Sequence, residues 1–151
     1  MPMASHDPQT VRSEAKRRAT AAARATDGMP IALFEKDGIV HAVFSGSVTG
    51  KEFETMGAEL EELEATMPRA PNRFADLSRL TCPAAVTFAD VLALANRRRA
   101  LRFPNSSKTA ILARHPIAIA FVKMFQELTD HPQITIELFS DRDVALKWLA
   151  E

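Results

Sequence analysis

Hydrophobic positions recur along this chain with two periods, one typical of buried strands and one typical of helices. The clearest strand is residues 108–113, whose last four residues are all apolar, so neither face of the strand is polar. Such a run predicts a central parallel strand covered on both sides. Residues 117–128 follow after Arg114-His115-Pro116 and carry apolar residues at helical spacing. This strand, turn and helix form the β-to-α half of an α/β unit, around which the rest of the chain is organised.

The remaining strands are predicted from apolar runs and turn residues. Two apolar runs within residues 31–44 are separated by Asp37-Gly38. This dipeptide is the strongest short-range signal of a β-hairpin, because both central residues of the turn need positive φ. Residues 72–78 form the next predicted strand. Residues 133–139 alternate between apolar and polar side chains, which predicts a last strand with one solvated face.

Four helices are predicted to alternate with these strands, which gives the order ββαβαβαβα. The pairs expected to cap helices are Thr49 with Glu52, Thr87 with Asp90, and Ser140 with Asp143. The residues expected to face the sheet are Phe53, Met56, Leu60, Leu63 and Met67 in the first helix, Phe88, Val91, Leu92 and Ala95 in the second, Ile117, Phe121, Met124, Phe125 and Leu128 in the third, and Val144, Ala145, Trp148 and Leu149 in the fourth.

The predicted fold class is α/β, with a single mixed sheet of about five strands and about four helices. The N-terminal hairpin is antiparallel and the remaining strands are mostly parallel. A chain of 151 residues fits one domain, predicted over residues 30–151. Residues 1–29 are rich in alanine and arginine and have no apolar stripe, so they predict a flexible or helical extension. A basic arm that contacts a partner or nucleic acid is the main alternative for this segment, and a transit peptide is less favoured because Glu14 and Asp27 dilute the positive charge.

Charge and cysteine content exclude several classes of protein. The formal net charge is +0 with 25% charged residues, so no overall field favours nucleic acid, and no nucleic-acid partner is expected. Cys82 is the single cysteine, which fits a reducing compartment. No apolar run approaches the roughly 20 residues of a membrane-spanning helix. We therefore predict a cytoplasmic protein without a transmembrane segment.

Two clusters of charged residues have both a structural and a functional interpretation. The acidic face of the first helix is interpreted as solvated. Arginines at the end of the second helix are interpreted as stabilising it through their attraction to the negative end of the helix dipole. The alternative is that they form a binding patch for phosphate or an acidic partner. The acidic residues are Glu54, Glu59, Glu61, Glu62 and Glu64, and the basic ones are Arg97, Arg98, Arg99 and Arg102.

Several short motifs resemble those of STAS-like proteins, small relatives of anti-sigma-factor antagonists and of sulfate-transporter cytoplasmic domains that are often grouped with CRAL-TRIO lipid carriers. The resemblance covers about residues 31–150 and implies a non-enzymatic regulatory or protein-interaction module. The motifs are Asp76-Leu77-Ser78, Lys108-Thr-Ala-Ile, Met124-Phe125, and Phe139-Ser-Asp141 followed by Ala145-Leu-Lys-Trp148-Leu149.

In the anti-sigma-factor antagonists that this chain resembles, a serine within an Asp-Ser-Ser-Gly turn after the third strand is phosphorylated. The resemblance therefore implies a phosphoacceptor at the corresponding place in this chain. The corresponding stretch here, residues 81–87, contains neither glycine nor aspartate. Ser78 and Thr81 remain candidate phosphoacceptors, with Thr87 as a third.

Ligands of open α/β sheets gather beyond the carboxyl ends of parallel strands, near helix N-termini. This edge is therefore the predicted site for a protein partner or for a small anion or lipid. The structural alternative is that its polar residues only cap helices and complete turns. The candidate binding residues are Ser78, Thr81, Cys82, Arg114, His115, Asp141 and Arg142.

The third helix is apolar over much of its circumference. Ile119 and Val122 on its flank are therefore candidates for a hydrophobic interface. The alternatives are burial inside the monomer, a homodimer contact, a lipid-like ligand or a membrane surface.

Catalysis is the least favoured function. Cys82, His115 and Asp76 offer the residue types of a thiol triad, but nothing in their spacing requires one, and no nucleophile-elbow, Walker or dinucleotide motif is present. We predict no enzyme activity, no cofactor and no metal. The predicted function is a STAS-like regulatory or protein-interaction module, and the alternative is a carrier or sensor of a lipid-like or small anionic ligand.

Overall fold

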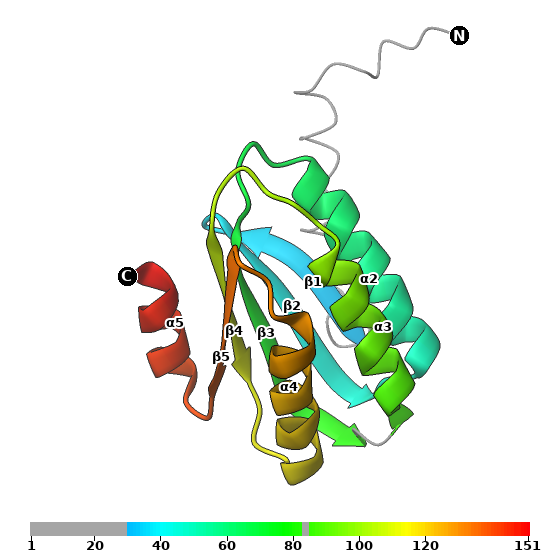
Figure 1. The fold of residues 1–151 in the computed structure, drawn as a ribbon. Helices are drawn as coiled ribbons and strands as arrows, with labels where there is room; N and C mark the ends of the chain where they lie inside the picture. Colours follow the sequence, from blue (N-terminus) through cyan, green and yellow to red (C-terminus); the bar gives the residue numbers. More distant parts are fainter. Residues whose placement is uncertain (1–29, 83–84) are drawn as a thin grey trace, which may run out of the picture.

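The computed structural model describes residues 30–82 and 85–151, which form one sheet with helices on both of its faces (Figure 1). The predicted extension, residues 1–29, lies outside the described residues. The strands are β1 (Ile31–Lys36), β2 (Ile39–Ser47), β3 (Asn72–Cys82), β4 (Ser107–Leu112) and β5 (Ile134–Phe139), and the helices are α2 (Gly50–Ala65), α3 (Phe88–Arg99), α4 (Pro116–Thr129) and α5 (Arg142–Ala150).

The five strands form a single mixed sheet in the order β1-β2-β3-β4-β5. β1 and β2 are antiparallel, and every other neighbouring pair is parallel. In the hairpin turn, Asp37 has φ 54° and Gly38 has φ 81°, as the Asp-Gly signal requires. The predicted α/β class, element order, hairpin and mostly parallel remainder are confirmed.

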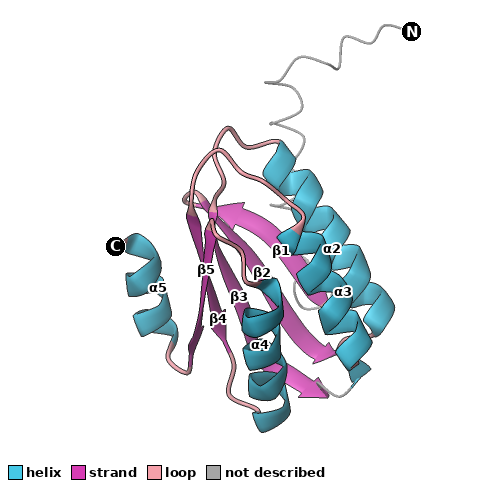
Figure 2. Cartoon of the chain, viewed as in Figure 1, coloured by secondary structure: helices cyan, strands magenta, loops and turns pink. Residues whose placement is uncertain are grey.

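The helices divide unequally between the two faces of the sheet (Figure 2). α2, α3 and α4 cover one face, and α5 alone covers part of the other. β4 lies between the two layers, because Ala110 and Leu112 pack toward α5 while Ile111 and Ala113 pack toward α4. The apolar run of this strand therefore has the double covering that the sequence predicts.

In three helices, most of the predicted apolar stripe packs toward the sheet but one of its residues is exposed. These residues are Phe88 in α3, Ile117 in α4 and Val144 in α5. In α3, Phe88 is 56% exposed, and the buried stripe consists of Val91, Ala95 and Arg98. Arg98 can occupy a buried position because an ion pair compensates its charge. In α4, Ile117 is 42% exposed. The buried residues of this helix are Ala118, Val122 and Thr129.

The start of α5 also differs from the prediction. Asp141, not Ser140, is the N-cap, and its carboxylate accepts a hydrogen bond from the backbone N–H of Val144 at 3.0 Å. The capping boxes Thr49/Glu52 and Thr87/Asp90 are both present, as predicted.

Within the two described ranges, none of the helices combines the length and apolar character needed to cross a membrane.

Replacement of a buried phenylalanine should show how strongly α5 is held to the sheet. Phe74 is 1% exposed and packs with residues of β4 and α5. We expect Phe74→Ala to lower the free energy of unfolding by about 3–5 kcal/mol, because it leaves a cavity in the core. Urea denaturation followed by circular dichroism measures this change.

The same substitution at the exposed Phe88 is the matched control, and it should change the free energy of unfolding by less than about 1 kcal/mol. Equal losses for the two variants would contradict the assignment of Phe74 to the core.

Candidate ligand-binding site

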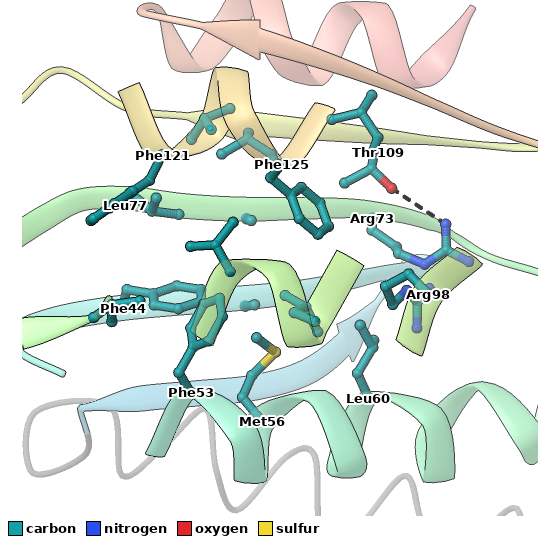
Figure 3. Close-up of a pocket in the computed structure, with 18 of the residues that line it drawn as sticks. Phe44, Phe53, Met56, Leu60, Arg73, Leu77, Arg98, Thr109, Phe121 and Phe125 are labelled. Atoms are coloured by element: carbon teal, nitrogen blue, oxygen red, sulfur yellow. Dashed lines mark hydrogen bonds between the residues drawn. The ribbon is translucent and has the colours of Figure 1, made fainter. Parts of the chain in front are cut away.

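A cavity of about 140 Å³ lies between the sheet and the layer formed by α2, α3 and α4 (Figure 3). Its walls are almost entirely apolar, and they come from both the strands and the three helices. Ala42, Ala75 and Ala118 are among the lining residues. Because an alanine side chain is a single methyl group, these positions leave space that a larger apolar residue would fill.

Polar side chains are confined to one end of this cavity. Figure 3 shows Arg73, Arg98 and Thr109 close together there. Phe44 and Phe121 lie toward the opposite end. The polar end corresponds to the start of β3 and β4, and thus to the amino ends of the parallel strands. The cavity is therefore amphipathic along its length.

The polar end contains a buried ion cluster of three side chains from three elements. Glu64 of α2 accepts a hydrogen bond from Arg73 Nε at 2.5 Å. It also accepts two hydrogen bonds from the guanidinium of Arg98, at 2.7 and 2.8 Å. All three side chains are buried. Two guanidinium cations share one carboxylate, so the cluster carries a net charge of +1 away from water.

Neutral groups solvate part of this excess charge. Arg73 Nη1 donates to Ser107 Oγ at 2.9 Å and more weakly to Thr109 Oγ1 at 3.4 Å. The ring of Phe103 lies 5.3 Å from Arg73 Cζ and 5.8 Å from Arg98 Cζ, within the range of cation–π attraction. None of these neighbours is an anion, so the net charge of the cluster is unchanged.

Two buried polar atoms at this cavity have no hydrogen-bond partner among the described residues. They are Nη2 of Arg73 and Oγ1 of Thr129, and both residues line the cavity. A buried donor without a partner costs about 1–3 kcal/mol, and more if it is charged. A bound acceptor would remove this cost.

The pKa values of the cluster follow from its burial and pairing. Burial alone would raise the pKa of Glu64, but the hydrogen bonds and charges of Arg98 and Arg73 outweigh it, and the pKa is lowered from 4.5. The pKa of Arg73 is lowered by burial and by the charge of Arg98, against the opposing effect of Glu64. The carboxylate is therefore ionised at neutral pH.

At the carboxyl edge of the sheet, the structure brings together only part of the predicted site. Asp76 is 4% exposed, and its Oδ1 accepts from the backbone N–H and the hydroxyl of Ser78 at 2.9 and 2.6 Å. Its Oδ2 accepts from Arg142 Nη1 at 3.0 Å. Asp76 thus joins Ser78 to Arg142 and uses both of its oxygens within the protein.

The other predicted residues of this edge have local contacts. His115 caps α4, with its Nδ1 accepting from the N–H of Ile117 at 3.1 Å, and Asp141 caps α5. Arg114 donates to the backbone carbonyl of Ser140 at 3.2 Å. Thr81 and Cys82 are exposed at the end of β3. Capping and turn formation therefore account for much of this edge.

The predicted hydrophobic interface on α4 needs one correction. Val122 is 3% exposed and packs with Ile111 and Ala113 in the core, so it does not lie on the surface. Ile119 is half-buried and packs against the same cluster. The monomer itself covers the part of the flank that contains Val122.

Glu64 and Arg73 are site residues that the sequence patterns did not predict, and Arg98 was predicted only as a member of an arginine patch at the end of its helix. Glu64 was assigned to a solvated face, and this assignment is wrong because its side chain is buried. A usable signal was present, because Glu64 lies four residues after the apolar Leu60 and Arg98 lies three after Ala95. Opposite charges on the apolar stripes of two successive helices indicate a buried ion pair.

Comparisons with known proteins add no family assignment. A scan against protein-family models and a search of curated proteins both find no match. In residues 30–82 and 85–151, no group of three or more histidine, cysteine, aspartate or glutamate side chains is placed to hold a metal ion. The site must therefore be interpreted from its own geometry.

Removal of the Glu64 carboxylate should be strongly destabilising. Glu64→Gln leaves two buried guanidinium groups without an anion, and we expect it to lower the free energy of unfolding by about 3–5 kcal/mol. Glu61→Gln, one turn earlier in α2, is the matched control, because Glu61 pairs with Arg97 at a partly exposed position. The control should cost less than about 1 kcal/mol in urea denaturation. A similar cost for the two variants would contradict a buried role for Glu64.

The contribution of Glu64 should also depend on pH. Its pKa is lower in the folded protein than its ordinary value of 4.5, so its stabilisation is complete well above that value and is lost as the pH falls below it. The difference in unfolding free energy between the wild type and Glu64→Gln should therefore stay constant from about pH 7 to about pH 6 and shrink below about pH 4.5. Urea titrations across this range measure it. A difference that persists unchanged at about pH 3.5 would contradict the prediction.

Proposed function

We propose that this protein is a non-enzymatic binding module, a carrier or sensor that holds a small amphipathic molecule in the cavity beneath α2, α3 and α4. The cavity of about 140 Å³ is the observation that carries the proposal. Protein interiors are close-packed, and an empty apolar space costs stability because its walls lose contacts. A bound molecule would restore those contacts.

The size of the cavity limits the ligand. A cavity of about 150 Å³ lined by apolar side chains binds benzene. The ligand is therefore about as large as a single aromatic ring or a short branched chain, with room for a small polar group at the end near Arg73. The sequence-based alternative was a carrier or sensor of a lipid-like or small anionic ligand. The volume of the cavity limits that ligand to the smallest molecules of these two classes.

A binding role is also favoured by the contacts of the residues considered for catalysis. The carboxylate of Asp76 is bonded to Ser78 and Arg142, and Nδ1 of His115 accepts from the backbone. Both groups that could have activated Cys82 are thus engaged in other contacts. The exposed free thiol of Cys82 also supports the proposed cytoplasmic location, because such a location is reducing.

The STAS-like regulatory or protein-interaction role remains a proposal that rests on the motifs and the element order. The most exposed large apolar side chains in the described ranges are Phe88, Ile117 and Val144, which belong to three different helices. Apolar residues exposed singly are normal for a soluble protein. We therefore place the cavity, and not an outer surface, at the centre of the proposed function.

Toluene is a suitable first probe of the cavity. At a concentration of ten times its dissociation constant, it should stabilise the protein by about 1.4 kcal/mol. Ala75→Leu adds apolar atoms inside the cavity and should abolish this stabilisation, since Ala75 lines it. Thermal denaturation with and without toluene measures the effect.

Ala120→Leu adds the same atoms at an exposed position of α4 and is the matched control. It should keep the response to toluene. Toluene binding that is equal in Ala75→Leu and the wild type would place the ligand elsewhere and contradict the proposed function.

A further inference from the structure

We infer that the polar end of the cavity recognises a carboxylate, so that the ligand is a small monocarboxylic acid with an aromatic or short apolar body. This inference rests on the proposed function, and it assigns the chemical class of the ligand. Three features of the polar end support it: the net charge of the ion cluster, the unpartnered donors of Arg73 and Thr129, and the position of the cluster at the end of the apolar cavity.

The net charge favours a single negative charge on the ligand. Glu64, Arg73 and Arg98 together carry +1 in a buried place, and burial of an uncompensated charge costs several kcal/mol. A bound monoanion makes the total charge zero. A neutral ligand leaves the charge uncompensated, and a dianion reverses its sign.

The unpartnered atoms supply donors for the carboxylate oxygens. Nη2 of Arg73 and Oγ1 of Thr129 both lack partners among the described residues, and both can donate to an anionic oxygen. Arg99 Nη1 donates to the carbonyl of Leu128 at 3.3 Å, which joins the end of α3 to the end of α4. This contact places Thr129, the last residue of α4, at the same end of the domain as Arg98.

The apolar remainder of the cavity fits the rest of such a molecule. Phe44, Phe53 and Phe121 offer ring faces and edges away from the charged end (Figure 3). A ring held among them would extend its acid group toward Arg73. Ordered water is the competing occupant of the polar end, because water can satisfy both donors but cannot neutralise the charge.

Three probes of nearly equal size separate these cases. Toluene tests the apolar cavity alone, benzamide adds a neutral polar group, and benzoate adds a carboxylate of nearly the same shape. Calorimetric titration of the 151-residue chain at neutral pH should give a dissociation constant for benzoate at least about tenfold lower than for benzamide, because hydrogen bonds to a charged group are stronger.

Thr129→Val tests the assigned donor without removing a hydrogen bond of the free protein, since the hydroxyl has no partner. The substitution keeps the shape of the side chain, so the variant should fold. It should weaken benzoate binding about tenfold more than it weakens toluene binding. Thr135→Val, at an exposed position of β5, is the control and should bind benzoate like the wild type.

The outcomes distinguish this inference from the proposed function. If none of the three probes binds, the cavity is not a ligand site and the proposed function fails. If toluene binds but benzoate is no tighter than benzamide, the cavity stands, the carboxylate inference is overturned, and water satisfies the polar end. If Thr129→Val binds benzoate as tightly as the wild type, the assignment of the anion to this end is overturned.

Discussion

The arrangement of this domain depends on the buried carboxylate of Glu64. It pairs with Arg73, the second residue of β3, and with Arg98 in the last turn of α3, so it fixes α2, β3 and α3 to one another. A buried ion cluster is weak support for stability by itself, because removing charges from water nearly offsets their attraction. The cluster instead favours one arrangement of the three elements, since any arrangement that separates the partners leaves a charge buried alone.

The same ion cluster explains why side chains do not completely fill the space between the sheet and the helices α2, α3 and α4. Arg73 and Arg98 occupy positions that apolar side chains would take in an ordinary core, and their guanidinium groups must stay within hydrogen-bond distance of Glu64. They therefore cannot fold back into the space beside them. Ala75 and Ala118 leave further room along the cavity. The amphipathic cavity is thus a consequence of how the charged residues are held.

The fold was predictable because the residues that determine each turn and strand are close together in the sequence. The site was not fully predictable, because the residues that form it are far apart in the sequence. Asp37-Gly38 determines its turn through the φ values of two adjacent residues, and the run 110–113 is apolar whichever partners it meets. Glu64, in contrast, is buried because Arg73 and Arg98, which lies 34 residues later, neutralise it. The positions of Glu64 and Arg98 on apolar stripes indicate a buried pair, but the sequence patterns do not reveal Arg73 as a third member or the cavity beside them. The patterns also misplaced Phe88, Ile117 and Val144, because tertiary contacts decide which residues of a helix are buried.

The position of the candidate site at the amino ends of the strands has a structural reason. Anions usually bind at helix N-termini, where backbone N–H groups are free. In the described ranges, a side chain caps the N-terminus of each helix. The capping residues are Thr49 for α2, Thr87 for α3, His115 for α4 and Asp141 for α5. The carboxyl edge therefore has fewer free donors than the topology suggests, and Asp76 adds a negative charge there. Unpartnered donors and excess positive charge coincide instead at the opposite end, beside Arg73, and recognition of an anion is more favourable there.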